Sequence, residues 1–191
     1  MDNGPQFYKA IFIDKDGVIV DNSCYPTPPS DKLLPQAVKG LETLSSMDYK
    51  VIIISNQSWI GKGKLSVQEV ESIFQSLTEQ LNLLGVSLTA WYTCPHIKEE
   101  GCECRKPSSH LILKASQEHH IDLSESYFIG DMTSDILAGK RAGTTTILVK
   151  TGQSGEDNRY PVKPDYTFPT FTEAIYHILK MDLEEDSNGK P

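Results

Sequence analysis

Short apolar runs alternate along the chain with longer segments in which apolar residues recur at helical spacing. Residues 50–55 (KVIIIS) are apolar almost throughout, which favours a strand that is buried on both faces of a parallel sheet. Similar patterns predict strands over residues 8–13, 87–93, 126–130 and 144–150, with a short edge strand over 166–168. The pattern therefore predicts a sheet whose strands are separated by other elements.

Helical periodicity fills the spaces between the expected strands. Residues 66–85 carry an apolar stripe, and Ser66 with Glu69 forms an S-x-x-E capping box at its start. Thr170 and Glu173 form a second such pair. We expect helices over residues 34–47, 66–85, 109–119, 133–143 and 170–179. Strands that alternate with helices predict right-handed βαβ units, and hence an α/β fold with an open, central parallel sheet flanked by helices.

The length and composition favour a single domain. A chain of 191 residues is of ordinary size for one domain with its own core. We expect this domain to span residues 1–181, and we expect the polar residues 182–191 (DLEEDSNGKP) to be a flexible tail. The strand and helix pattern contains no insertion long enough for a large cap domain.

The charge of the chain excludes two classes of partner. Its net charge of −8 and pI near 5.1 disfavour binding to nucleic acid and to anionic membranes. No apolar run reaches the roughly 18–20 residues that span a bilayer, and the start MDNGPQFYK lacks the pattern of a signal peptide. We therefore expect a cytoplasmic protein that acts as a monomer on a small molecule.

Polar residues directly follow three of the expected strands. The stretch AIFIDKDGVIVDN places Asp14 and Asp16 after the first strand, SNQS (55–58) ends the second, and Asp131 follows SYFIG. Ligands of open α/β sheets bind beyond the carboxyl ends of the strands, so these groups should meet at one edge. Lys106, between the third and fourth strands, brings a positive charge toward the same edge.

This set of groups suits phosphoryl transfer. Carboxylates that share one point repel each other unless a cation lies between them, and Mg²⁺ prefers such oxygen ligands. Asp14 could attack phosphorus to form an aspartyl-phosphate, and Asp16 could protonate the leaving oxygen and then activate water. Ser55 and Asn56 would hydrogen-bond phosphoryl oxygens, and Lys106 would neutralise developing charge. A single aspartate at a strand end often only caps a helix or a turn, so the joint arrangement carries the argument.

The segment CPHIKEEGCECRKP contains a compact set of metal-ligand residues. Three thiolates and one imidazole form a closed tetrahedral set, which suits a structural Zn²⁺. The expected ligands are Cys94, His96, Cys102 and Cys104. Zinc would stiffen a loop that ends in Arg105 and Lys106, whereas Cys24 is expected to be an ordinary thiol. A zinc-stabilised binding module without activity is an alternative, but it would not require the acidic residues.

The sequence resembles the haloacid dehalogenase-like (HAD) phosphatase superfamily over residues 8–180. The motifs that carry the resemblance are DKDGV at 14–18, Ser55 with Asn56, Lys106, and GDMTSD at 130–135. The resemblance implies a Rossmann-like fold, with Asp14 as nucleophile and Asp16 as general acid and base. It further implies that Mg²⁺ is held by Asp14, Asp131 and the backbone carbonyl of Asp16. Asp135 is expected to lie behind these ligands or at the start of a helix.

The zinc segment narrows the resemblance to two groups without a large cap, the heptose bisphosphate phosphatases and the histidinol-phosphate phosphatases. The stretches SNQSWIGKGKLS and ILVKTGQ are similar to the heptose group, whereas the short gap between His96 and Cys102 is typical of the histidinol group. The resemblance favours removal of the 7-phosphate of D-glycero-D-manno-heptose 1,7-bisphosphate, a step toward lipopolysaccharide core. Hydrolysis of histidinol phosphate is the alternative.

Several of the motif residues are also expected to line the substrate pocket. Its substrate-binding residues are expected to be Asn22, Tyr25, Ser55, Asn56, Gln57, Ser58, Arg105 and Lys106. The planar fork of Arg105 suits a second phosphate or a pair of hydroxyl groups. Three positions depart from the heptose group: Lys15 replaces arginine, Trp59 replaces glycine, and Met132 replaces a cation. Trp59 is expected either to face the substrate or to pack within its loop.

Overall fold

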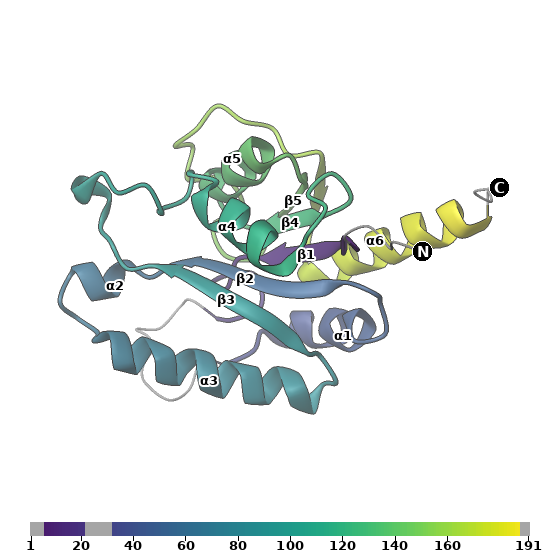
Figure 1. The fold of residues 1–191 in the computed structure, drawn as a ribbon, viewed down its shortest axis with the longest axis horizontal. Coiled ribbons are helices and arrows are strands. Elements are labelled where there is room, and N and C mark those ends of the chain that lie inside the picture. Colours follow the sequence, from purple (N-terminus) through teal and green to yellow (C-terminus); the bar gives the residue numbers. More distant parts are fainter. Residues whose placement is uncertain (1–5, 22–31, 188–191) are drawn as a thin grey trace.

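A computed structural model of the chain describes residues 6–21 and 32–187. Asn22, Cys24 and Tyr25 therefore lie outside the described residues. Figure 1 shows a central sheet with helices packed on its two faces.

The sheet has six parallel strands in the order β3-β2-β1-β4-β5-β6. The strands are β1 (Ala10–Ile13), β2 (Lys50–Asn56), β3 (Leu88–Cys94), β4 (Tyr127–Gly130), β5 (Thr145–Val149) and β6 (Tyr166–Phe168). The chain builds outward from β1 to β3 and then returns to β4 on the other side of β1. The carboxyl end of β1 therefore lies where the strand order reverses, which is the usual ligand site of such sheets. The expected α/β fold is confirmed.

Two sets of helices cover the sheet (Figure 1). Helices α1 (Pro35–Leu44), α3 (Val67–Leu83) and α6 (Phe171–Ser187) contribute to one hydrophobic cluster, whereas α4 (His110–His119) and α5 (Thr133–Ala142) contribute to the other. Two short elements, α2 (Ser58–Gly61) and the 3-10 turn η1 (Lys98–Glu100), lie in the loops that follow β2 and β3. The structure thus has three layers, with the sheet in the middle.

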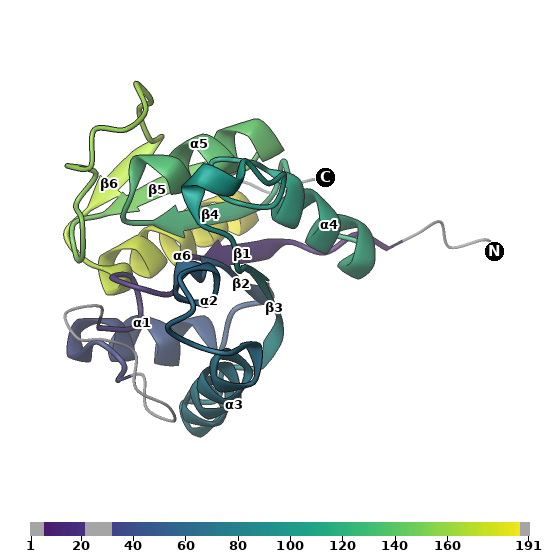
Figure 2. The same ribbon diagram turned by 90° about the vertical axis from the view of Figure 1, so that its left-hand side faces the viewer.

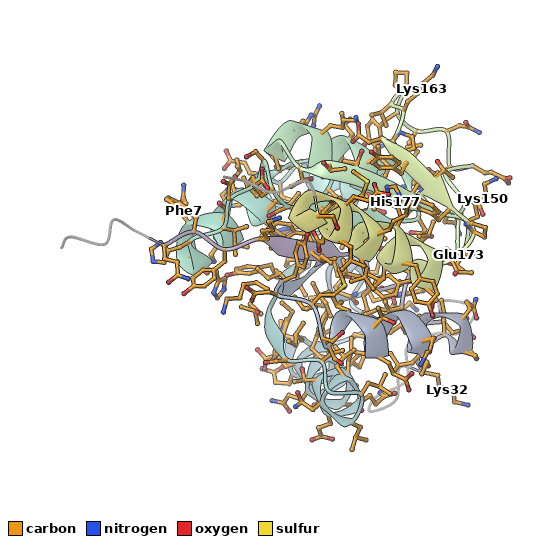
Figure 3. All side chains as sticks on the ribbon, turned by 90° about the vertical axis from the view of Figure 1, so that its right-hand side faces the viewer. Phe7, Lys32, Lys150, Lys163, Glu173 and His177 are labelled. Atoms are coloured by element: carbon orange, nitrogen blue, oxygen red, sulfur yellow. The ribbon has the colours of Figure 1, made fainter. Side chains whose placement is uncertain are left out.

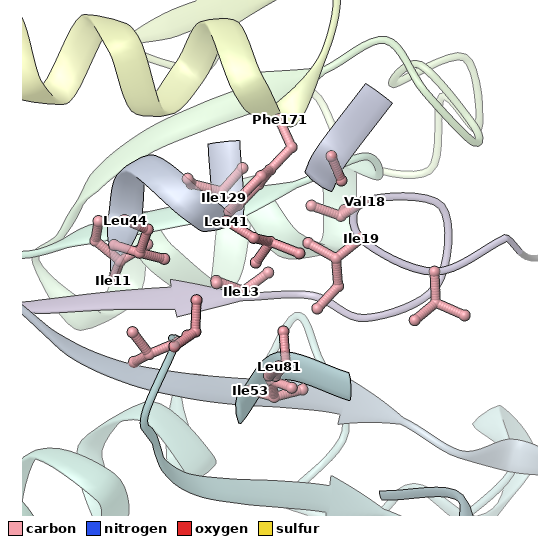
Figure 4. Packing of buried hydrophobic residues seen from close by; sticks show 14 of the residues in the cluster. Ile11, Ile13, Val18, Ile19, Leu41, Leu44, Ile53, Leu81, Ile129 and Phe171 are labelled. Atoms are coloured by element: carbon pink, nitrogen blue, oxygen red, sulfur yellow. The ribbon is translucent and has the colours of Figure 1, made fainter. Parts of the chain in front are cut away.

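The central strand β1 is inaccessible to solvent along its whole length. Ile11 and Ile13 pack into the cluster with Leu41 of α1 and Phe171 of α6, as Figure 4 shows. Phe12 points to the opposite face and packs with α4 and α5. Burial on both faces explains why this strand is apolar throughout.

The expected helix starts are present. The Glu69 amide donates to Ser66 Oγ at 3.1 Å, and the Ser66 amide donates to Glu69 Oε2 at 2.7 Å, which completes the capping box of α3. Thr170 and Glu173 make the equivalent contacts before α6. Helix α6 continues to Ser187, so the first residues of the expected tail are helical.

The carboxyl edge of the sheet faces the viewer in Figure 2. The loops after β2, β3 and β5 lie around it, and they are the segments that carry the expected functional residues. None of the helices in the described residues is long and apolar enough to cross a membrane.

Candidate active site

Lys106 lies at the centre of a buried ionic cluster. Its Nζ donates to Asp14 Oδ1 at 2.6 Å and to the carbonyl oxygen of Ile54 at 2.8 Å, and it pairs with Asp135 Oδ1 at 2.8 Å. The three side chains are almost fully buried. Because these three acceptors match the three protons of an ammonium group, Lys106 is fixed in position between β1, β2 and α5.

Burial changes the acidity of this cluster. It raises the pKa of Asp14 to about 7, against the opposing effect of Lys106, and it raises the pKa of Asp131 to about 8 with help from the charge of Asp14. Burial alone would lower the pKa of Lys106, but Asp135 and Asp14 raise it above its ordinary value. The carboxylates of this edge thus have more negative charge than Lys106 alone can balance.

The carboxylate cluster fits a divalent cation. One oxygen from each of Asp14, Asp131 and Asp135 lies within 4.8 Å of the others. Asp131 Oδ1 is buried and has no hydrogen-bond partner among the described residues. Both oxygens of Asp135 are engaged, Oδ1 by Lys106 and Oδ2 by the Met132 amide at 3.0 Å. Asp14 and Asp131 therefore remain as the carboxylates available to a hard cation such as Mg²⁺.

Asp131 is held by the loop that follows β5. The Gln153 amide donates to its Oδ2 at 2.6 Å, and the Gly155 amide donates to its carbonyl oxygen at 2.7 Å. Gly152 has a φ of +66°, and a Cβ atom there would lie 2.2 Å from Asp131 Oδ2. The close approach of this loop therefore requires glycine.

Asp16 makes its side-chain contacts outside the carboxylate cluster. Its Oδ1 pairs with the buried Lys15 Nζ at 2.6 Å, and its Oδ2 accepts a hydrogen bond from Gln57 Nε2 at 3.1 Å. Gln57 Nε2 also lies 2.8 Å from Ser55 Oγ. Gln57, which the sequence analysis expects to bind substrate, is buried and hydrogen-bonds both Asp16 and Ser55.

Asn56 connects two of the sequence motifs. Its Oδ1 accepts from the Lys106 amide at 3.0 Å, and its Nδ2 donates to the Lys106 carbonyl oxygen at 3.3 Å. The end of β2 is thereby joined to the segment that carries Lys106. This pair of contacts explains how a lysine far along the chain reaches Asp14.

A cavity of about 470 Å³ opens above this cluster at the carboxyl edge. Expected residues that line it include Asp14, Asp16, Ser55, Asn56, Ser58 and Arg105. Lys106 and Asp131 line it as well, as do four residues that the sequence patterns did not identify: Lys98, Gln153, Arg159 and Tyr160. The volume is in the range of pockets that hold small metabolites.

Trp59 and Met132, two of the residues that differ from the heptose group, lie in different environments. Trp59 is partly buried against the hydrophobic core, and Lys62 Nζ lies 4.9 Å from the centre of its ring. Trp59 is not among the residues that line the cavity, so its loop packing explains its presence. Met132 does line the cavity and contributes no charge there.

The expected zinc ligands converge. The ligand atoms of Cys94, His96, Cys102 and Cys104 all lie within 4.8 Å of one another. Cys94 Sγ is 3.5 Å from Cys102 Sγ and 3.1 Å from Cys104 Sγ, which is too far for a disulfide bond. His96 Nδ1 is 3.2 Å from Cys104 Sγ. This arrangement fits one tetrahedral Zn²⁺ with no open position.

The cysteine–histidine cluster is linked to the cavity through Arg105. Its Nη1 donates to the carbonyl oxygen of His96 at 3.0 Å, and its side chain lines the cavity. The same segment continues directly into Lys106. The cluster thus stabilises the loop that carries two of the cavity's cations.

The structure also identifies Asp157, which no sequence motif indicated. Its Oδ1 accepts from the Thr133 amide at 2.8 Å, and Thr133 Oγ1 donates to its Oδ2 at 2.7 Å. This contact fastens the loop after β5 to the start of α5. No spacing rule connects a residue in an irregular loop with a helix that begins 24 residues earlier.

Comparison with known proteins identifies the family of the chain. The HAD-hydrolase-like family model matches residues 103–174. A D-glycero-beta-D-manno-heptose-1,7-bisphosphate 7-phosphatase of Helicobacter pylori is 40% identical over 136 residues, which is 70% of this chain and 79% of the relative. The enzyme of the same name from Pasteurella multocida is 34% identical over 153 residues, 76% of this chain and 83% of the relative.

A solved structure has the same fold. The D,D-heptose 1,7-bisphosphate phosphatase of B. bronchiseptica, complexed with magnesium and phosphate, superposes with a TM-score of 0.82 at 24% identity. The superposition covers 91% of this chain and 99% of that one. The chain belongs to the haloacid dehalogenase-like hydrolases, in the family of the heptose-1,7-bisphosphate 7-phosphatases.

Proposed function

We propose that this protein is a phosphatase that removes the 7-phosphate of D-glycero-D-manno-heptose 1,7-bisphosphate. The observation that carries the proposal is the buried cluster of Asp14, Asp131 and Lys106 beneath a cavity lined by cations. The relatives that match most of the chain carry the same activity in their names.

Asp14 acts as the nucleophile in this proposal. Lys106 holds Oδ1, so Oδ2 attacks phosphorus, the P–O bond to the sugar breaks, and an aspartyl-phosphate forms. Asp16 gives its proton to the departing sugar oxygen and later takes a proton from the water that hydrolyses the aspartyl-phosphate. Ser55 donates a hydrogen bond to a phosphoryl oxygen. Lys15 and Gln57 keep the Asp16 carboxyl group oriented for both transfers.

Two metal ions complete the proposed site. Asp14, Asp131 and the Asp16 backbone would hold Mg²⁺, which when bound offsets the negative charges of phosphate and carboxylates. Asp131 is preset for this task because the loop after β5 fixes one of its oxygens. Zn²⁺ would bind the cysteine–histidine cluster and hold Arg105 and Lys106 in place.

The experiment compares phosphate release from heptose 1,7-bisphosphate and from histidinol phosphate, with and without Mg²⁺. We expect Mg²⁺-dependent turnover and a kcat/KM at least tenfold higher for the heptose substrate. Asp14→Asn should abolish turnover because an amide cannot act as the nucleophile, and melting curves should show that it folds. Both anomers of the heptose are tested separately.

The short gap between His96 and Cys102 is the feature that favours the histidinol alternative. A higher kcat/KM for histidinol phosphate would assign that compound as the substrate in place of the heptose bisphosphate. The proposed mechanism through an aspartyl-phosphate would be unaffected. A wild-type protein that releases phosphate from neither compound, nor from an aryl phosphate, would contradict the phosphatase activity itself.

A further inference from the structure

Two cations at the mouth of the cavity have no role in the chemistry proposed above. Lys98 belongs to η1 in the loop after β3, and Arg159 belongs to the loop after β5. Both side chains are exposed and both line the cavity. Within the described part of the chain, neither side chain has an ion pair or a hydrogen bond. They differ in this from Lys106, whose three protons are all engaged.

The backbone next to Arg159 is fixed. Asp157, two residues earlier, accepts from the amide of Thr133 at 2.8 Å and from its hydroxyl at 2.7 Å. Thr133 is the first residue of α5 and follows Met132, which lines the cavity. Arg159 therefore follows an anchored segment of the loop after β5, and its side chain adds a positive charge to the cavity lining.

The charges of the cavity are arranged in two zones. The floor holds buried carboxylates with Lys106, whereas Lys98 and Arg159 at the mouth are exposed and face no carboxylate partner among the described residues. Arg105 lies between the zones, with one of its amino groups already engaged by the His96 carbonyl. A protein with a net charge of −8 thus presents unpaired positive charge at one cavity. Such an arrangement attracts a ligand that has a second anionic group away from the reacting one.

We propose that Arg159, assisted by Lys98, binds the phosphate that is not hydrolysed and thereby sets a preference for bisphosphates over monophosphates. This inference rests on the proposed function, since it assigns the remote end of the same substrate. The guanidinium group can give two parallel hydrogen bonds to a phosphate, and the Lys98 ammonium adds a point charge. Both groups contact the substrate far from the bond that breaks, so they contribute to binding rather than to chemistry.

The test measures kcat/KM of wild type, Arg159→Gln and Lys98→Gln on heptose 1,7-bisphosphate and on heptose 7-phosphate. For Arg159→Gln we expect a loss of about tenfold on the bisphosphate, mainly through KM, and less than a threefold change on the monophosphate. Arg159→Lys should recover part of the loss. Lys98→Gln should have a smaller effect in the same direction.

Lys163→Gln is the matched control, because Lys163 lies in the same loop, carries the same charge and points away from the protein body in Figure 3. This variant should leave kcat/KM unchanged on both substrates. An equal loss on both substrates, or no loss on either, would contradict the assignment of Arg159. If wild type cleaves neither heptose phosphate, the proposed function is contradicted, whereas the assignment of Arg159 is not. In that case, kcat/KM of wild type and of Arg159→Gln is compared on glucose 1,6-bisphosphate and on glucose 6-phosphate, and a loss on the bisphosphate alone supports the role of Arg159.

Discussion

Asp131 depends on a glycine in a distant loop for its position. The loop after β5 reaches Asp131 because Gly152 has no side chain and adopts a positive φ. The neighbouring amide of Gln153 can then donate to Asp131 Oδ2, while Oδ1 has no partner among residues 6–21 and 32–187. The free oxygen faces the site where we place Mg²⁺, so a single missing side chain prepares a metal ligand.

Gly152→Ala should impair the metal site more than the fold. The new Cβ would lie 2.2 Å from Asp131 Oδ2 and 2.8 Å from the Gly17 Cα, so Asp131 or the loop must move. We expect Mg²⁺ affinity and kcat/KM to fall about tenfold or more, because misplaced ligands bind weakly. Titration of activity against Mg²⁺ concentration measures the change.

Gly63→Ala is the control for backbone strain. Gly63 has a φ of +64°, close to that of Gly152, but a Cβ there has no atom within 4 Å. It should lower the free energy of unfolding by about 1 kcal/mol and leave the Mg²⁺ titration unchanged. If both variants shift the titration equally, the close contact with Asp131 is not the cause.

The sequence predicted the residues that follow a strand or belong to a recognisable motif, and it missed residues that the loop after β5 brings in. Asp14 and Asp131 were identifiable because parallel strands end at one edge, so strand prediction alone places them. Asp157 and Arg159 lie in an irregular loop whose path depends on tertiary contacts, such as the one with Thr133. The motif SNQS identified Gln57, but only the structure shows that it contacts Asp16.

At the level of elements, the segment between β3 and α4 combines stability with function. Three of its residues converge with Cys94 at the end of β3 as expected zinc ligands, and its own end delivers Arg105 and Lys106 to the cavity. The strand before it and the helix after it were predictable from their apolar patterns. The segment itself has no regular structure beyond the short η1, so its shape depends on the cluster that closes it.

Removal of zinc should therefore lower both stability and activity. We expect one Zn²⁺ per chain in the purified protein, measured by elemental analysis. Cys104→Ser should lose this ion and lower the melting temperature by several degrees, because metal binding contributes to folding. It should also lower kcat/KM, since Arg105 and Lys106 lose their support.

Cys24→Ser is the control for loss of a thiol, because Cys24 is not one of the four expected ligands. It should keep the zinc and the full activity. A Cys104→Ser protein that retains its zinc content would show that the cluster is not the binding site. A protein that loses zinc but keeps wild-type kcat/KM would show that the loop is positioned by other contacts.

At the level of the whole molecule, folding must bury negative charge that Lys106 balances only in part. Two core clusters surround β1, and the carboxylates at its end are buried with it. The pKa of Asp14 is raised to about 7 and that of Asp131 to about 8, mainly by burial. Both values lie well above the usual 3.8, so the metal-free folded protein retains protons that the unfolded chain releases.

This difference predicts how stability depends on pH and on Mg²⁺. Without metal, the free energy of unfolding should fall as pH rises from about 4 to about 8, because the folded state must give up protons that it holds more tightly than the unfolded state. Bound Mg²⁺ replaces those protons and stabilises the folded state. Mg²⁺ should therefore raise the melting temperature by several degrees near pH 8.5 and by little near pH 5.5. Asp131→Asn should remove most of this difference, and an equal Mg²⁺ effect at both pH values would contradict the proposed site.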